Sequence, residues 1–420
     1  MDKKIKGSWL IHHTNKLQGV TSQSGYENTY LAGKAGILLS AISADSEITI
    51  NNDRLTVLAK AANINTAFEL PRLIEVLQQQ KLIDKSAGGL AVLGITSTSA
   101  LQHTSDLFDS LTPNANELAS ITLAERASEV PILTKDVQDE LADTHKLASS
   151  ELEQLFTEAE QIGFVDVEEL STNQKLLFNG NLFRRDATRK IKAVLDSLTI
   201  GDQAKLNELT EILRKKACVD TEFAKRFLGG PLFQKVTAIG LFDISVVSNS
   251  KEEVGFLTLP SAFSKYSSSM IDDAFDLAKA FVSSITYGMT KSSYARGQIQ
   301  MVDVLLSALV RGESVGPVAA IAEDYKVLEL KGVVEVKHGS KKGRNGPMLR
   351  LLKKDIGELA LQVIRQGDVS EYSLQDLPTA AVTKFNGPEY NRERSRRTQI
   401  QQSPRATNDM LSILRTGGVL

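Results

Sequence analysis

The chain has 420 residues, of which 42% are hydrophobic and 24% are charged, and its formal net charge is −2. This composition is typical of globular proteins that bury hydrophobic cores, and the length predicts about three domains. The near-neutral charge excludes a uniformly basic coat for nucleic acid, so an electrostatic partner must bind to local patches. The single cysteine, Cys218, excludes a disulfide framework and a cysteine-based zinc site.

The sequence also bears on location. The first residues, MDKKIKGSW, are basic, but the apolar stretch of a secretory signal does not follow them. No run approaches the 18 apolar residues that a membrane-spanning helix needs. We therefore expect a cytoplasmic protein without a membrane partner. Residues 1–28 contain Trp9 and the adjacent pair His12-His13, and we expect them to form a partly ordered arm.

A pattern recurs along the chain at intervals of about eighty residues. In each copy a predicted helix is followed by two apolar residues, an acidic residue and a strand. The four copies are Leu82-Ile83-Asp84, Phe164-Val165-Asp166, Leu241-Phe242-Asp243 and Val333-Val334-Glu335. Glycine precedes the last three copies, as is common where a helix ends with a positive φ. The repeat predicts four similar units in one chain.

The first unit contains a helical stripe over residues 70–77, and the spacing of Thr66 and Glu69 predicts a capping box before it. The outer face of this helix would carry two carboxylates, Glu69 and Glu75, which repel phosphate, so a protein contact fits it as well as DNA does. The second unit is acidic between residues 135 and 169, which favours a solvated helical face over an acidic docking surface. Its Asn179-Gly180 predicts a hairpin turn.

A cationic segment follows, and it either contacts phosphates or forms an ordinary solvated helix face. Its residues are Arg184, Arg185, Arg189, Lys190 and Lys192. The third unit has the clearest pattern, with helices over 203–218 and 221–228, a third helix opened by Pro231, and strands over 241–247 and 254–259.

Residues 332–352 of the fourth unit form the most distinctive stretch of the chain. The sequence GVVEVKHGSKKGRNGPMLRLL predicts two strands joined by a glycine-rich basic loop, which we call the basic wing. Its candidate phosphate-binding residues are Lys337, His338, Lys341, Lys342, Arg344 and Arg350. Base preference, if present, is expected from the preceding helix, at Glu323, Lys326 and Glu329. Segment 315–331 fits either one helix or two.

The order of helices and hairpins resembles that of tandem winged helix-turn-helix proteins as a broad class. This resemblance implies a mainly α fold with small β-hairpins (α+β), in which tandem winged-helix units are joined by helical connectors. We expect a disordered basic tail at the end. The expected parts are an arm (1–28), unit 1 (29–104), a connector with unit 2 (105–185), unit 3 (186–262), a connector with unit 4 (263–368), and the tail (369–420). The class binds duplex DNA with a helix in the major groove and the wing on the backbone, and some copies serve only for dimerisation or partner docking.

No catalytic motif was found: the sequence lacks a Walker loop, GxSxG, HExxH, GxGxxG and paired CxxC motifs. No cofactor or metal is expected. The leading hypothesis is a non-enzymatic protein that binds double-stranded DNA, either a transcriptional regulator or the DNA-contacting subunit of a larger prokaryotic complex for genome maintenance or defence. We expect a protein partner or homodimer. The alternatives are a protein-interaction scaffold and, third, a metal-dependent nuclease whose Asp, Glu and Lys residues are scattered along the chain.

Overall fold

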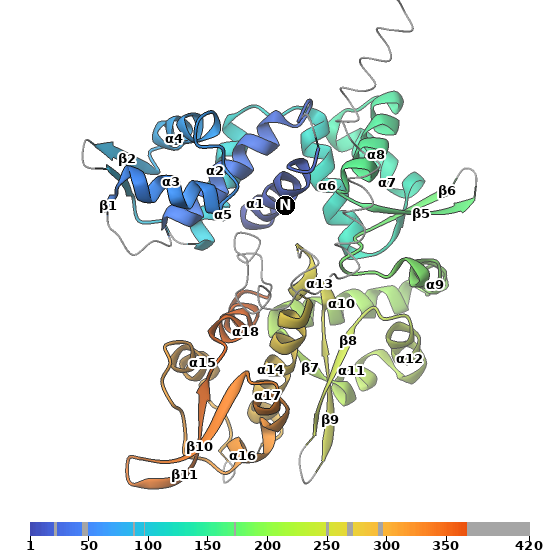
Figure 1. The fold of residues 1–420 in the computed structure, drawn as a ribbon. Helices are drawn as coiled ribbons and strands as arrows, with labels where there is room; N and C mark the ends of the chain where they lie inside the picture. Colours follow the sequence, from blue (N-terminus) through green and yellow to red (C-terminus); the bar gives the residue numbers. More distant parts are fainter. Residues whose placement is uncertain are drawn as a thin grey trace, which may run out of the picture. The chain divides into compact units, whose positions relative to one another are not determined.

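The computed structural model describes residues 1–20, 23–43, 49–86, 89–95, 97–171, 174–248, 252–266, 272–292 and 297–367. The chain is mainly helical, with small antiparallel sheets of two or three strands, in agreement with the expected α+β class (Figure 1). It divides into an N-terminal body that ends at Gly180 and a C-terminal body that begins at Asn181. The expected basic tail lies outside the described residues.

One order of elements occurs in three units, namely a helix, a short strand, two helices and a β-hairpin, and a fourth unit repeats it with a single β-bridge in place of the short strand. We number these copies units 1 to 4 in chain order. Unit 1 comprises α2 (Glu27–Ser43), β1 (Thr49–Ile50), α3 (Asn52–Ala61), α4 (Glu69–Gln79), β2 (Ile83–Ser86) and β3 (Gly89–Val92). Unit 2 comprises α6 (Ala115–Glu129), β4 (Ile132–Leu133), α7 (Thr134–His145), α8 (Ser149–Ile162), β5 (Asp166–Ser171) and β6 (Gln174–Phe178). Both belong to the N-terminal body.

Units 3 and 4 belong to the C-terminal body. Unit 3 comprises α10 (Ile200–Lys216), β7 (Val219–Asp220), α11 (Thr221–Leu228), α12 (Gly230–Ala238), β8 (Asp243–Ser248) and β9 (Glu253–Thr258). Unit 4 comprises α15 (Val302–Val310), α16 (Ala320–Asp324), α17 (Lys326–Leu330), β10 (Val334–Lys341) and β11 (Arg344–Leu351). Tyr325 separates α16 from α17, so the segment that fitted one helix or two is two short helices.

A third strand joins the hairpin in units 1 to 3, and the sequence did not predict it. The short strand that follows the first helix pairs with the last strand, giving the orders β1-β3-β2, β4-β6-β5 and β7-β9-β8. In unit 4 a single bridge between Val315 and Leu349 takes this place. A strand of two residues is too short to show the alternation by which strands are recognised in a sequence.

The expected N-terminal arm is instead helix α1 (Lys3–Leu17), which lies in the core of the N-terminal body. Trp9, Leu10 and Ile11 are fully buried, and the indole Nε1 of Trp9 donates a hydrogen bond to Glu125 Oε2 at 2.6 Å. The prediction failed because α1 is enclosed by neighbours. Its buried residues therefore do not follow the one-sided stripe of a surface helix.

Glycines allow α1, α2 and α5 (Ser97–Ser110) to pack closely. A Cβ atom on Gly7 of α1 would lie 2.1 Å from the carbonyl oxygen of Leu101 in α5. One on Gly33 of α2 would lie 1.9 Å from Thr14 Oγ1 of α1. One on Gly36 would lie 2.1 Å from Oγ1 of Thr104. The three helices therefore contact each other at positions where no side chain fits.

Two local predictions were wrong in detail. Thr66 does not cap α4; Asn65 Oδ1 accepts from the N–H groups of Ala67 and Phe68, and Glu69 Oε2 accepts from Asn65 N–H. Asn179-Gly180 is not a hairpin turn, because β6 has already ended at Phe178. Asn179 is buried, and its side-chain amide donates to Ser128 Oγ at 2.8 Å. The turn before α4 is thus formed by Asn65 in place of Thr66, and Asn179 serves a buried contact with α6 in place of a turn.

The C-terminal body has a continuous apolar core that runs from α10 to α18 (Lys354–Gln366). The long helix α14 (Asp272–Thr290) supplies Phe281 and Val282 to this core, and α18 supplies Leu359. Helix α9 (Arg185–Asp196) and the short helix α13 (Pro260–Ser264) complete the described elements. The base of the β10–β11 hairpin is fixed in the same core through Val334, Leu349 and Leu351.

Candidate nucleic-acid interface

The basic wing is the β10–β11 hairpin, whose strands have eight residues each. A two-residue turn, Lys342-Gly343, joins the strands, with φ values of 51° and 73°. Positive φ at both central positions is the conformation of a type I′ turn, which matches the twist of the strands. Glycine meets this requirement without strain, whereas Lys342 does so at a cost. The sequence prediction of a hairpin over this stretch is therefore confirmed, but the expected glycine-rich loop is wrong, because its residues pair as strand up to Lys341 and from Arg344 on.

Strand register places most of the expected cations on one face of the wing. Lys341 pairs with Arg344, Lys337 with Met348, and Glu335 with Arg350. Because successive side chains alternate between faces, these pairs all lie on the same side of the hairpin. The opposite face carries the buried anchors of the hairpin and, farther out, the exposed His338. The wing therefore presents a strip of four cations and one carboxylate.

The cations of the wing differ in their contacts. Lys337 Nζ lies 2.7 Å from Glu335 Oε1, and Lys341 Nζ donates to the carbonyl oxygen of Ser314 at 3.0 Å. Lys342, Arg344 and Arg350 are exposed, and their side chains form no hydrogen bond or ion pair with any other residue that the structure describes. These three side chains are therefore available to a partner without the loss of an existing contact.

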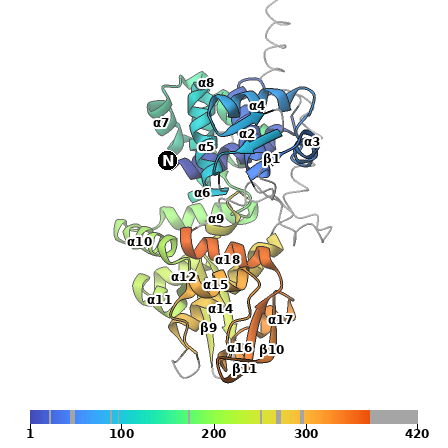
Figure 2. The same cartoon turned by 90° about the vertical axis from the view of Figure 1, so that its left-hand side faces the viewer.

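The second expected basic segment lies on α9. Arg184, Arg185, Arg189 and Lys190 are exposed, whereas Lys192 Nζ forms an ion pair with Asp196 at 2.6 Å. Buried Thr188 and Ile191 form the inner side of the helix. In both views of the C-terminal body, α9 lies at the end opposite the tip of the wing (Figures 1 and 2). The structure does not bring the two cationic segments together.

The helices before the wing do not form a basic face. Val327 and Leu330 of α17 are 58% and 86% exposed. Glu329, an expected base-reading residue, instead accepts a hydrogen bond from Val336 N–H at 3.3 Å, at the base of the wing. Glu323 is half-buried and Lys326 is exposed. This surface is mixed apolar and charged.

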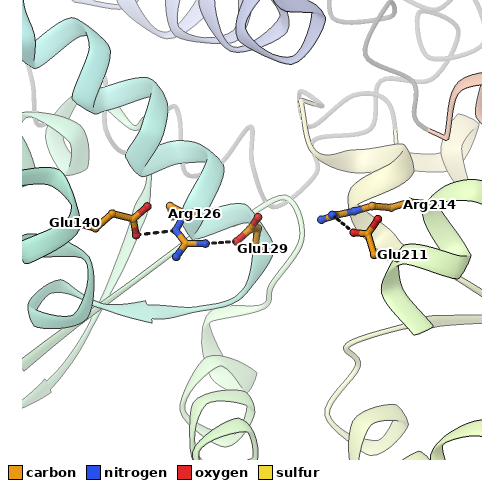
Figure 3. Close-up of polar contacts among 5 residues, drawn as sticks. All are labelled: Arg126, Glu129, Glu140, Glu211 and Arg214. Atoms are coloured by element: carbon orange, nitrogen blue, oxygen red, sulfur yellow. Dashed lines mark hydrogen bonds and ion pairs between the residues drawn. The ribbon is translucent and has the colours of Figure 1, made fainter. Parts of the chain in front are cut away.

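A third cationic surface, in unit 3, was missed in the sequence. Its exposed cations lie at the end of α10, on α11 and on α12: Lys215, Lys216, Lys225, Arg226 and Lys235. Helices α11 and α12 contain one acidic residue, Glu222. The neighbouring Arg214 is engaged by Glu211, with Nη1 and Oε1 2.6 Å apart (Figure 3). The signal was present in the sequence as six cations between residues 214 and 235, but they are spread over three elements.

Unit 2 shows the opposite arrangement. Arg126 Nε lies 3.0 Å from Glu140 Oε2, and its Nη1 lies 2.8 Å from Glu129 Oε2 (Figure 3). Burial disfavours its charge, but the two carboxylates outweigh this effect and raise the pKa of Arg126. Lys175 on β6 pairs with Glu160 at 3.4 Å. These cations are neutralised by carboxylates and offer little to a phosphate backbone.

Other chemistry has little support in the described residues. Among them, no three His, Cys, Asp or Glu side chains lie close enough together to hold a metal ion. Burial raises the pKa of the Cys218 thiol to about 12, so it is a poor nucleophile. None of the described helices combines the length and hydropathy needed to cross a membrane. A scan against models of protein families and a search of curated protein sequences each found no match for this chain.

Proposed function

We propose that this protein is a tandem winged helix-turn-helix protein that binds double-stranded DNA through the wing of unit 4. The repeated order of helix, strand, two helices and hairpin supports the winged-helix assignment. The observation that carries the DNA proposal is the strip of cations on one face of the wing together with Lys342 at its turn; the side chains of Lys342, Arg344 and Arg350 have no partner among the described residues. A cation held out on a rigid hairpin is well placed to neutralise a phosphate.

The proposed binding mode positions the protein on the DNA backbone rather than reading its sequence. Each cation that neutralises a phosphate releases a counterion, and this release drives non-specific binding. The mixed surface of α17 argues against strong base readout by unit 4. The basic surface of unit 3, on α11 and α12, is the better candidate for a helix that enters a groove. We propose a non-enzymatic, cytoplasmic role, as a regulator or as the DNA-contacting subunit of a larger complex.

A fluorescence-anisotropy titration of labelled duplex DNA at several salt concentrations tests this proposal. The test variant is Lys342→Ala/Arg344→Ala/Arg350→Ala, in which all three substituted residues are exposed and folding should be preserved. The slope of log affinity against log salt should become less steep by about 2.7, because about 0.9 is lost for each phosphate contact. The matched control is Arg184→Ala/Arg185→Ala/Lys190→Ala on α9, which should leave the slope unchanged. If only the control variant changes the slope, the DNA site lies on α9; if neither does, the wing is a solvated turn.

The scaffold function remains a second proposal, with its own supporting observation. Phe68, immediately before α4, is 82% exposed, and Leu330 on α17 is 86% exposed. Each of these side chains offers apolar surface that could pack against a protein partner, and substitution of each tests whether it does. Sedimentation velocity of Phe68→Ser and Leu330→Ser variants tests the homodimer form of this proposal. A dimer that dissociates in one variant would assign that surface to self-association.

A further inference from the structure

A pocket of about 580 Å³ lies beside the tip of the wing, within the C-terminal body. Its sides come from the segment before α15 (residues 297–301), the bridge segment 315–318, α16 and the wing itself. The bridge segment is fastened to β11 by the Val315–Leu349 bridge and by a hydrogen bond from Val318 N–H to the Pro347 carbonyl at 3.1 Å. The pocket volume lies within the range of sites that bind small molecules.

The walls of this pocket are mostly apolar. Ile299, Leu305, Val318, Ile321 and Leu349 line it, and all of them also pack against the core of the C-terminal body. Side chains fixed in a core keep the shape of the pocket and lose little entropy on binding. Such walls suit an occupant with an apolar, rigid body.

Charge is concentrated at one end of the pocket. Lys341, Lys342 and Arg344 line it from the tip of the wing, and the contact of Lys341 Nζ with the Ser314 carbonyl holds one of these cations in place. Three cations within four residues favour a group with more than one negative charge, such as a phosphate, over a single carboxylate. In the wall, Asp324 is 5% exposed and adds a carboxylate, whose oxygens can accept hydrogen bonds from several donors.

We propose that this pocket binds a nucleotide, with the base between the apolar walls and the phosphate on Lys342 and Arg344. A base is a flat ring with amino or imino hydrogens, for which Asp324 supplies an acceptor. A base within a duplex is stacked and paired and cannot enter, so the occupant is a free nucleotide or an unpaired nucleotide of a DNA or RNA strand. The inference goes beyond duplex binding by the wing, because it rests on the pocket; Lys342 and Arg344 are common to both proposals, and the pocket walls and Asp324 belong to this one alone.

Isothermal titration calorimetry with the four common 5′-mononucleotides, and separately with a short single-stranded oligonucleotide, tests the proposal on the full chain. The wild type should bind at least one of these probes saturably. The Lys342→Ala/Arg344→Ala variant should weaken this binding by about tenfold or more, since it removes charge-assisted contacts to the phosphate. The matched control is Arg350→Ala, a cation on the same hairpin that does not line the pocket. It should leave nucleotide binding unchanged while weakening duplex binding.

A pocket-filling variant separates this site from the DNA proposal. Val318→Trp places a large side chain in the pocket and should abolish nucleotide binding without reducing duplex binding. If thermal unfolding shows that this variant is destabilised, Met301→Ala serves instead, because Met301 lines the pocket yet is largely exposed. It should weaken binding severalfold. If the wild type binds the oligonucleotide but none of the mononucleotides, and the pocket variants lose this binding, the occupant is an unpaired nucleotide of a strand. Failure of every probe to bind saturably, or binding that the pocket variants leave intact, overturns the proposal.

Discussion

The hairpins of units 2 and 4 occupy the same place in the same order of elements, and their charges are opposite. In both units the last strand lies between its hairpin partner and a segment that follows the first helix. The β5–β6 hairpin carries Glu168 and Glu169, and its Lys175 is paired with Glu160. The β10–β11 hairpin carries four cations on one face, and only Glu335 offsets them there. The same topology therefore carries hairpins of opposite charge in the two units.

Buried carboxylates of the N-terminal body contrast with the exposed cations of the wing. In the N-terminal body the fully buried Glu117 accepts hydrogen bonds from the N–H groups of Thr29 and Asn114, which ties α6 to α2. The fully buried Glu158 accepts from the hydroxyl of Tyr26 at 3.0 Å. Both carboxylates accept hydrogen bonds inside the body and are not accessible to a partner. In the wing of the C-terminal body, charged side chains are held out from the surface, where a partner can reach them.

The largest expected effect is on DNA affinity, in variants that exchange the charges of the two hairpins. The triple variant Lys342→Glu/Arg344→Glu/Arg350→Glu should weaken duplex binding by on the order of a thousandfold at ~0.1 M salt, because three phosphate contacts are lost and repulsion is added. The reciprocal variant Glu168→Lys/Glu169→Lys should strengthen it by about tenfold. Anisotropy titrations of both variants at one salt concentration provide the measurement. If the reciprocal variant weakens binding, charge does not explain the difference between the hairpins.

The N-terminal body should lose stability in acid because of one buried histidine. His13 is fully buried and its ring stacks on Phe164, with the ring centroids 3.9 Å apart. Burial lowers its pKa from 6.5 to about 3. In the unfolded chain His13 is therefore protonated below about pH 6.5, whereas in the folded body it stays neutral down to about pH 3. Stability present above pH 6.5 should fall by about 1.4 kcal/mol for each pH unit across this window.

Trp9, the single tryptophan, lies in the same body, so its fluorescence reports the unfolding of that body alone. Urea titrations at several pH values should show this loss in the wild type and a flatter profile in His13→Phe. His338 on the exposed wing is the control, and His338→Phe should retain the wild-type profile. An unchanged profile in His13→Phe would mean that other groups cause the acid sensitivity.

A smaller effect on stability is expected when a glycine at a helix contact of the N-terminal body is replaced by alanine. Gly33→Ala should lower the free energy of unfolding by about 2 kcal/mol, because its Cβ would lie 1.9 Å from Thr14 Oγ1 and 2.9 Å from the Leu10 carbonyl. The matched control is Gly201→Ala in α10, where the nearest atom, Thr199 Oγ1, would lie 3.8 Å away. This control should stabilise its helix by a few tenths of a kcal/mol, since alanine is the better helix former. Thermal melts of both variants measure these changes, and a Gly33→Ala protein as stable as the wild type would contradict the close helix contact.

The smallest expected effect concerns a buried cation of the C-terminal body. Lys279 of α14 lies 2.7 Å from Asp243 and 3.2 Å from Asp276. Burial disfavours its charge, but the two carboxylates outweigh this effect and raise the pKa of Lys279. Asp243→Asn should destabilise the C-terminal body by about 1–2 kcal/mol, whereas Asp276→Asn should have less effect because Asp276 is well exposed. Hydrogen exchange of β8 measures the difference, and equal effects would show that burial of the pair is unimportant.

Much of the fold was predictable from local patterns. The helices and strands of unit 3 were predicted close to their observed bounds, because Pro231 and the alternation after Gly240 are local signals. The wing was predicted from its glycines, cations and β-branched residues. The burial of α1 was not predictable, because it depends on packing against α5 and on contacts such as that of Trp9 with Glu125, which are far away in the sequence. The roles of Asn65 and Asn179 were also missed, since each depends on which donor or acceptor the fold brings near.

The sequence by itself determined the repeat of helices and hairpins and the residues that can neutralise phosphate, because both follow from the spacing of apolar, glycine and charged residues along the chain. Only the tertiary structure decided that the cations of α9 and the wing lie at opposite ends of the C-terminal body. It also decided that a two-residue strand or a single bridge completes each hairpin, and that segments 297–301 and 315–318 enclose a pocket beside the wing. The physical reason is that these features depend on packing between residues far apart in the chain, and periodicity carries no information about which distant faces will meet.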